Sequence, residues 1–177
     1  MGYSDKLIQM KTDKKEAFIT MLDAHKKIIY KIVHSYCKNK EDRKDLEQEI
    51  LIQLWNSFDK YNADYKYSTW MYRIALNVAI SFYRKEKKWV LKNDFNNENS
   101  IYYIADEMEN DSEQDHNIKL LQEFISRLKE LDKALMLLYL EEKSHEEIAE
   151  ILGVTKTNVA TKISRLKLKL KQEFQKI

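Results

Sequence analysis

The chain has 177 residues, 44% of them hydrophobic and 34% charged, and it contains two glycines and no proline. Average usage would place roughly a dozen glycines and about nine prolines in a chain of this length. Because residues that form turns and interrupt helices are nearly missing, the composition predicts an all-α fold. A single cysteine, Cys37, excludes an internal disulfide bond, and no apolar run approaches the length of a membrane span. We therefore expect a cytoplasmic protein without membrane insertion.

Charge is distributed unevenly along the chain, although its net value is only +2. Residues 1–92 carry nineteen basic and twelve acidic residues, 93–117 carry eight acidic and no basic residues, and 118–177 carry twelve basic and nine acidic residues. Two basic blocks joined by an acidic segment predict two small helical domains, over 14–90 and 117–177, with an acidic flexible linker over 91–116.

The first block is predicted to form a helical bundle. Apolar residues recur at helical intervals over about 14–38 and, after a charged break at 39–43, at intervals of four up to about residue 59. A polar, aromatic loop over 61–67 then leads into a third long helix that reaches about residue 88. Ser68 or Thr69 is the expected N-cap of that helix.

The second block is predicted to form a four-helix unit. Apolar residues at helical spacing indicate helices over about 118–128 and 132–142. An acidic amphipathic run and a basic one follow, and the last helix is expected to extend from Lys156 to about Phe174.

The last two predicted helices have the spacing of a helix-turn-helix. Gly153 follows Ala149 by four positions, and Val159 comes six positions after Gly153. Ala149 lets two helices approach closely, Gly153 suits the positive φ of the turn, and Val159 packs the second helix onto the first. This pattern makes the chain a candidate DNA-binding protein.

The final helix concentrates basic and short polar side chains opposite its apolar face. Residues 154–177 carry seven basic residues and one acidic residue. Lysines that hold phosphates, beside short side chains that let the backbone approach, suit entry into a DNA major groove. A lysine-rich amphipathic helix can also be a solvated surface, but the preceding turn favours DNA binding. The residues expected to contact DNA are Lys156, Thr157, Asn158, Thr161, Lys162, Ser164 and Arg165.

The loop and helix after residue 60 interleave aromatic and basic residues. Exposed aromatic rings beside cations can hold unpaired bases by stacking while the cations hold the backbone. The alternative is that the rings are ordinary packing residues, as aromatic residues at helical spacing usually are. The opposite stripe of the helix, from Met71 to Phe82, is assigned to the core. The candidate contacts with DNA are Tyr61, Tyr65, Lys66, Tyr67, Ser68, Trp70, Arg73, Asn77, Ser81, Arg84 and Lys88.

Three segments, in the right order, resemble a known family. They are Asp45-Leu-Glu-Gln48-Glu49-Ile-Leu-Ile-Gln-Leu-Trp55, the stretch from Phe58 to Asn77, and the helix-turn-helix block. They are similar to the corresponding segments of extracytoplasmic-function sigma factors, compact members of the bacterial RNA polymerase sigma family. The resemblance covers about residues 14–90 and 117–175. It implies an alternative sigma factor, a non-catalytic subunit that brings core polymerase to promoters and captures melted bases.

The resemblance also implies roles for the candidate residues. The loop from Tyr61 to Ser68 would hold a base flipped from the non-template strand, with Trp70 nearby, and the stripe from Arg73 to Arg84 would face the −10 region. The C-terminal domain would read the −35 element and contact the β flap of the polymerase. The acidic linker would thread toward the active-site and RNA-exit channels, and an anti-sigma factor is the expected inhibitor. The residues that would dock on the clamp helices of the β′ subunit are Asp45, Gln48, Glu49 and Trp55.

Two other classes of protein are weighed against this hypothesis. A stand-alone helix-turn-helix repressor would form a symmetric dimer on a palindromic site. An enzyme has little support, because the chain has no glycine-rich phosphate loop and no nucleophile–base pattern. His34 and Cys37 lie one helical turn apart, but no further ligands with zinc spacing accompany them. We therefore expect no metal and no cofactor.

Overall fold

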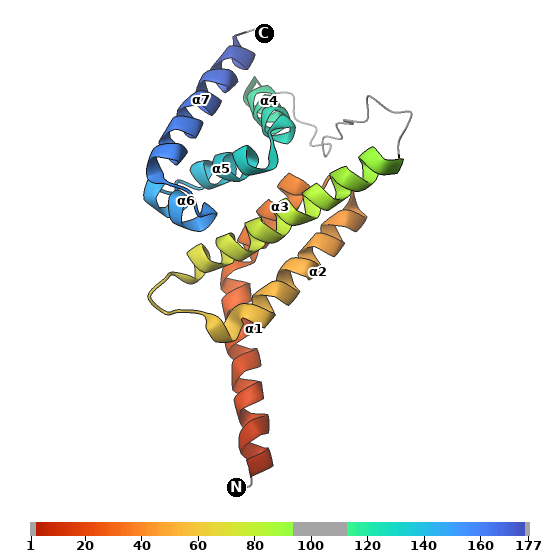
Figure 1. Ribbon diagram of the computed structural model, residues 1–177, viewed down its shortest axis with the longest axis vertical. Coiled ribbons are helices and arrows are strands. Elements are labelled where there is room, and N and C mark those ends of the chain that lie inside the picture. The colour runs from red at the N-terminus through yellow and green to blue at the C-terminus, as the bar shows by residue number, and fades with distance from the viewer. Residues whose placement is uncertain (1–2, 94–112, 176–177) are drawn as a thin grey trace.

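The computed structural model describes residues 3–93 and 113–175. Over these residues the chain forms seven α-helices and one short 3-10 helix, with no strand (Figure 1). The prediction of an all-α fold is confirmed. The elements are α1 (Tyr3–Tyr36), α2 (Lys40–Ser57), η1 (Phe58–Lys60), α3 (Tyr67–Asn93), α4 (Glu113–Arg127), α5 (Glu130–Leu140), α6 (His145–Leu152) and α7 (Lys156–Phe174).

Several helix ends differ from those predicted. The charged stretch 39–43 does not separate two helices but begins α2, because the Asn39 side chain accepts a hydrogen bond from the Asp42 backbone N–H at 2.7 Å and so caps the helix. Ser68 and Thr69 lie inside the first turn of α3 rather than before it. Helix α3 ends at Asn93 and α4 begins at Glu113, and most of the expected linker, residues 94–112, lies outside the described residues.

Helices α1, α2 and α3 pack into the first bundle. Leu46, Ile50 and Leu54 lie on one side of α2 and are fully buried against apolar residues of α1 and α3, such as Ile32 and Met71. Burying one such side chain contributes about 1.5–3 kcal/mol. The spacing of four that predicted this helix therefore also identifies the side that faces the core.

Helix α3 is enclosed on two sides. Successive residues of a helix are rotated by about 100°, so positions 71, 75, 78 and 82 form one side and positions 72, 76, 79, 80 and 83 a second. The first side lies in the core, as predicted from the sequence, and α1 and α2 pack against α3. The second side was not predicted to be buried, yet Tyr72, Leu76 and Ala79 are almost inaccessible because α5 and α6 cover α3. A third side is left for polar residues.

Helices α4 to α7 form the second bundle, and short-range hydrogen bonds define its turns. Ser144 and Glu147 form a capping box that begins α6, with bonds of 2.9 and 3.2 Å between side chains and backbone N–H groups. Gly153 ends α6 with φ 67° and ψ 35°, and the Val154 N–H reaches the Ala149 carbonyl at 3.0 Å. The Thr155 side chain then caps α7. These features confirm the predicted helix-turn-helix.

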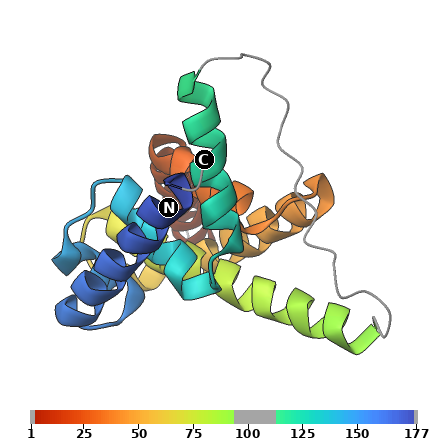
Figure 2. The same ribbon diagram turned by 90° about the horizontal axis from the view of Figure 1, so that it is seen from above.

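The two bundles lie directly against each other (Figures 1 and 2), with α6 and α5 along α3. Glu130, in the first turn of α5, is one point of attachment. Its backbone carbonyl accepts a hydrogen bond from the Tyr36 hydroxyl at 2.6 Å, and its carboxylate pairs with the Arg84 guanidinium at 3.1 Å. We call the set of contacts between the bundles the closed contact.

Glu141 is a second point of attachment in the closed contact. Its carboxylate accepts a hydrogen bond from the Tyr72 hydroxyl at 3.3 Å and forms an ion pair with Lys31. Burial, with the carboxylate of Glu141 next to the ring, raises the pKa of the Tyr72 hydroxyl, so this group remains a neutral donor.

Lys133 lies at the centre of the closed contact and is only 3% exposed. Its ammonium donates to the Ser35 carbonyl at 3.1 Å and lies 5.3 Å from the ring centres of both Tyr36 and Tyr83. Burial, reinforced by the nearby charge of Lys38, lowers the pKa of Lys133 to about 8. A cation enclosed in this way makes the closed contact sensitive to pH.

We predict that Gly153→Ala destabilises the protein by about 1 kcal/mol, because a side chain in the left-handed region is strained. A Cβ at this position would meet no atom within 4 Å, so the loss comes from the backbone conformation alone. Gly153→Asn is expected to lose less, since asparagine tolerates this conformation better. Urea denaturation midpoints measure both effects, and an alanine variant as stable as the wild type would contradict the assignment.

We predict that raising the pH from 8 to 10 favours the closed contact. Lys133 has a lowered pKa when enclosed and an ordinary value near 10.4 when exposed, so the closed state binds fewer protons in this range. Each unit of lowering corresponds to about 1.4 kcal/mol. Cys37 and Glu130 also act on Lys133, and above pH 10 the burial of Tyr36, which raises its pKa, opposes further closure.

Small-angle X-ray scattering at pH 7.5 and 9.5 measures this closure as a decrease in the radius of gyration. Lys133→Met fills similar space without a titrating group, and its radius is expected to be the same at both pH values. An equal decrease in this variant would show that another group is responsible.

Candidate polymerase and DNA interfaces

The residues predicted to dock on the polymerase share one outward side of α2. Asp45 and Gln48 are exposed and Glu49 is half-buried. In the described part of the chain, none of these three side chains has a hydrogen-bond or ion-pair partner. A protein partner can therefore bind these polar groups without breaking an internal bond.

Trp55 extends this side toward the end of α2. Its ring is 37% exposed and packs edge-on against Phe18 at 5.1 Å, while the Lys14 ammonium lies 4.5 Å from its centre. Lys14 is in turn paired with Asp59 at 2.6 Å. One edge of the Trp55 side chain is therefore held by packing and another is accessible. Anchor residues of protein interfaces have the same arrangement.

Ile52 belongs to the same side of α2 and was missed from the sequence. It lies four positions after Gln48 and three before Trp55, and it is 56% exposed. The spacing of three and four could have revealed it, because it places Ile52 at the centre of the proposed side rather than in the core. We call the five residues Asp45, Gln48, Glu49, Ile52 and Trp55 the docking face.

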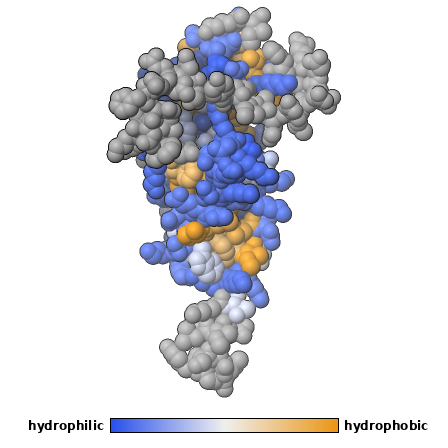
Figure 3. Space-filling view, turned by 90° about the vertical axis from the view of Figure 1, so that its right-hand side faces the viewer, coloured by the Kyte–Doolittle hydropathy of each residue, from blue (hydrophilic) through white to orange (hydrophobic). Residues whose placement is uncertain are grey.

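The face shown in Figure 3 is mostly hydrophilic, with apolar side chains gathered in patches on it. Large apolar side chains that α1 and α2 expose include Ile19, Ile52 and Trp55. Apolar groups exposed among polar ones are typical of protein interaction sites.

The aromatic residues around the start of α3 form a cluster rather than a set of isolated rings. The ring of Tyr61 stacks on that of Tyr67, with 4.2 Å between the ring centres, and meets the ring of Trp70 edge-on at 5.4 Å. The ring centres of Trp70 and Phe58 are 6.3 Å apart. The Tyr61 hydroxyl also donates to the Tyr65 carbonyl, which closes the loop on itself. Tyr61, Tyr67 and Trp70 thus pack against one another, as the alternative interpretation from the sequence expected, and contact with bases stays a prediction.

Tyr65 and Tyr67 are the accessible rings of this cluster, 49% and 39% exposed. Lys66 between them is exposed, whereas Ser68 is half-buried. A base approaching the loop would thus meet two tyrosine rings and one cation first. The packed rings behind them fix the shape of the loop.

The polar stripe of α3 lies on its third side. Arg73, Asn77, Ser81 and Arg84 are all exposed, although Arg84 already pairs with Glu130 in the closed contact. The side chain of Lys88 lies outside the described residues. The structure therefore brings the four described positions of the predicted stripe together on one surface.

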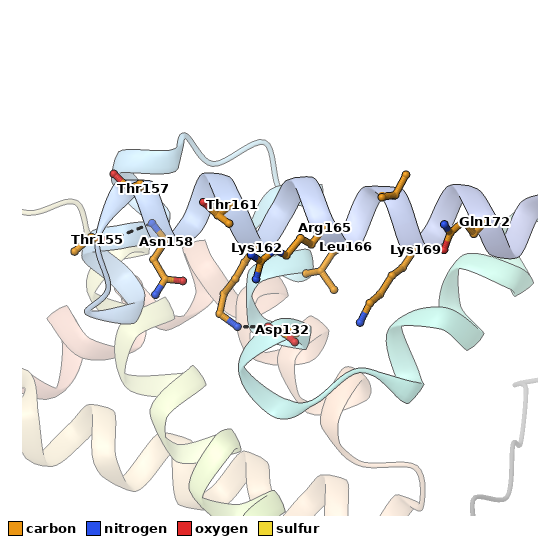
Figure 4. Close-up of a pocket in the computed structure, with 11 residues that line it drawn as sticks. Asp132, Thr155, Thr157, Asn158, Thr161, Lys162, Arg165, Leu166, Lys169 and Gln172 are labelled. Carbon is orange, nitrogen blue, oxygen red and sulfur yellow. Dashed lines mark hydrogen bonds and ion pairs between the residues drawn. The ribbon is translucent and has the colours of Figure 1, made fainter.

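The predicted reading residues of α7 lie around a shallow cavity of about 740 Å³ (Figure 4). Thr157, Asn158 and Thr161 at the start of the helix are exposed. Arg165 lines the cavity further along the helix, while Ser164 is exposed outside the lining. Because Val159 is fully buried beneath them, the polar side of α7 is held outward.

Two lysines of α7 already have acidic partners. The Lys162 ammonium lies 2.8 Å from the Asp132 carboxylate of α5 (Figure 4), and Lys156 pairs with Glu146 of α6. Phosphates would have to compete with these carboxylates. Arg165 has no such partner among the described residues, so it is a predicted DNA contact that is accessible without breaking an ion pair.

No group of three or more metal-ligating side chains occurs within residues 3–93 and 113–175. Over the same described ranges, no helix is both long and apolar enough to cross a membrane.

Comparisons with known proteins identify both bundles. Residues 21–89 match the family described as sigma-70 region 2, and residues 118–170 match sigma-70 region 4. The chain is 27% identical to the ECF RNA polymerase sigma factor SigW of Bacillus subtilis, over 99% of this chain and 98% of that protein. It is 29% identical to RNA polymerase sigma factor SigV of the same organism, over 89% of this chain and 91% of that protein.

Solved structures show the same fold. The structure of CnrH in complex with the cytosolic domain of CnrY matches with a TM-score of 0.64 and 18% identity, over 91% of this chain and 89% of that one. The structure of sigma factor RpoE in complex with the anti-sigma factor NepR, from Bartonella quintana, matches with a TM-score of 0.67 and 20% identity, over 92% of this chain and 97% of that one. The match to two sigma-70 regions in this order is not expected of a stand-alone repressor. The chain belongs to the extracytoplasmic-function sigma factors of the sigma-70 family, non-catalytic subunits that bind core RNA polymerase and direct it to promoters.

Proposed function

We propose that this sigma factor acts through three surfaces: the docking face of α2, the tyrosine loop with the polar stripe of α3, and the outer side of α7. The observation that carries the proposal is that the packing of both bundles leaves these three surfaces uncovered. A helical protein of this size buries most apolar residues, so a side that is accessible and chemically distinct is available for a partner.

The docking face is proposed to bind the clamp helices of the β′ subunit. Its centre is apolar, with Ile52 and Trp55, and its edge carries the carboxylates of Asp45 and Glu49. An apolar centre with a polar rim is the usual composition of a protein interface. The acidic rim favours a basic partner surface, which would also accelerate association.

The tyrosine loop is proposed to capture bases of the non-template strand in the −10 region. Unstacking a base requires a few kcal/mol, and stacking on an aromatic ring returns about 1–3 kcal/mol. The accessible rings of Tyr65 and Tyr67 supply the stacking, and Arg73 on the adjacent stripe can hold the backbone. Melting would then need no nucleotide hydrolysis.

The outer side of α7 is proposed to read the −35 element. Asn158 and Thr161 are close enough to the start of the helix to reach base edges in the major groove, while the lysines neutralise phosphates. We propose that the same domain contacts the β flap, and that the segment around 94–112 follows the polymerase channels.

Promoter binding is proposed to open the closed contact. The −35 and −10 elements are roughly 25 base pairs apart, which is about 85 Å at 3.4 Å per base pair, whereas α3 and α6 touch here. Arg84 must also exchange Glu130 for DNA. An anti-sigma factor is the proposed inhibitor, consistent with the complex of the sigma factor RpoE with the anti-sigma factor NepR.

We predict that the double substitution Gln48→Ala with Glu49→Ala weakens binding to core polymerase about tenfold, because two interface contacts are together worth about 1–2 kcal/mol. Glu47→Ala is the matched control, since Glu47 is on the same helix but outside the docking face. Surface plasmon resonance with immobilised core polymerase measures both. Run-off transcription tests the function itself, and a wild-type protein that binds DNA but not core polymerase would refute the proposal.

We predict that Tyr65→Ala and Trp70→Ala reduce open-complex formation at least fivefold while changing polymerase recruitment little. Tyr65 is half-exposed, so its loss removes a stacking surface without leaving a cavity. Trp70 is packed against Tyr61, and its variant needs a circular dichroism control for folding. Permanganate footprinting reports melted thymines, and gel shifts report recruitment. An equal loss at both steps for Tyr65→Ala would contradict a role in melting.

A further inference from the structure

A basic cavity lies where α1 ends and α2 begins, outside the three surfaces described above. Its volume is about 460 Å³, within the range of small-molecule sites. On α2 it is lined by Lys40, Arg43 and Lys44, and Lys44 lies one helical turn before Gln48. The cavity therefore borders the docking face but contains none of its five residues, and it lies apart from the polar stripe of α3.

Positive charge dominates the lining of the cavity. Lys38 joins the three basic residues of α2, and the single acidic side chain in the lining is that of Glu47. Within the described ranges, Lys40, Arg43 and Lys44 form no ion pair. A hollow lined by four basic side chains and one acidic side chain has a positive potential that attracts anions, so its composition favours an anionic ligand.

A hydrogen bond to the backbone holds the Arg43 side chain in a fixed orientation at the cavity. Its Nε–H donates to the Cys37 carbonyl at 3.0 Å, and the side chain is half-buried. This bond restrains one edge of the guanidinium and leaves its terminal N–H groups for a ligand. A restrained planar fork suits the paired oxygens of a phosphate better than a mobile lysine does.

An accessible aromatic ring forms the wall of the cavity contributed by α1. Tyr30 is 63% exposed, and its ring lies 3.8 Å from that of His34. His34 Nδ1 donates to the Tyr30 carbonyl at 2.9 Å, which fixes the imidazole against the tyrosine. One face of the Tyr30 ring is thus supported and the other is open, as a stacking surface for a planar base requires.

We propose that this cavity binds a nucleoside di- or triphosphate. The phosphates contact Arg43 and the lysines, and the base stacks on Tyr30. A cavity of this size encloses one nucleotide, which favours a free nucleotide over a nucleic-acid strand. Tyr30 and His34 also line a smaller cavity beside Tyr72 and Glu141, so the nucleotide would lie next to the closed contact.

Isothermal titration calorimetry of the full chain, without polymerase, tests the proposal independently of sigma activity. The probes are GTP, ATP, inorganic tripolyphosphate and a single-stranded DNA octamer, at low salt. We expect at least one nucleotide to bind at least tenfold more tightly than tripolyphosphate, because only the nucleotide can stack. No binding of either nucleotide at millimolar concentration, equal binding of tripolyphosphate, or tighter binding of the octamer would overturn the proposal.

Two sets of variants locate the site. Lys40→Ser with Lys44→Ser is expected to weaken nucleotide binding at least tenfold, whereas Lys15→Ser with Lys171→Ser removes the same charge at exposed positions elsewhere and should change it less than threefold. Tyr30→Leu should weaken nucleotide binding but leave tripolyphosphate binding unchanged. Equal losses in the two lysine pairs would show that the binding is only non-specific charge attraction.

Discussion

The packing of α3 is the constraint on which the rest of the structure depends. One side of this helix completes the core of the first bundle, a second is covered by α5 and α6, and the third remains polar and exposed. A helix has only about 360° to divide among these roles, so each is confined to a narrow stripe of side chains. The proposed promoter stripe and the closed contact are therefore neighbours, and Arg84 belongs to both.

The closed contact combines apolar packing of α5 and α6 on α3, where Leu76 and Ala79 are buried, with polar and charged groups that make it specific. Hydrogen bonds from Tyr36 and Tyr72 and the enclosed ammonium of Lys133 each contribute little net free energy, because the same groups are well hydrated when exposed. An entirely apolar interface of the same extent would hold the bundles together more firmly. The mixed composition suits the proposed separation of the two domains on DNA.

Sequence patterns predicted the parts of the site that depend on local geometry. The spacing of Ala149, Gly153 and Val159 predicted the turn because only a few conformations join two helices so closely. The stripe from Arg73 to Arg84 followed from helical periodicity. The aromatic loop was harder, since the ring of a residue such as Tyr61 can stack on a base or on another ring, and only the structure shows that it stacks on Tyr67.

By itself, the sequence determined the all-α fold, the two bundles and the identity of the chemical groups on each helix, because these follow from composition and from periodicity within single helices. The tertiary structure decided which of those groups are available. It paired Lys162 with Asp132, enclosed Lys133 between Tyr36 and Tyr83, exposed Ile52, and brought Tyr30 beside the lysines of α2. These facts depend on contacts between residues far apart in the chain, whose free energies no local pattern of residues encodes.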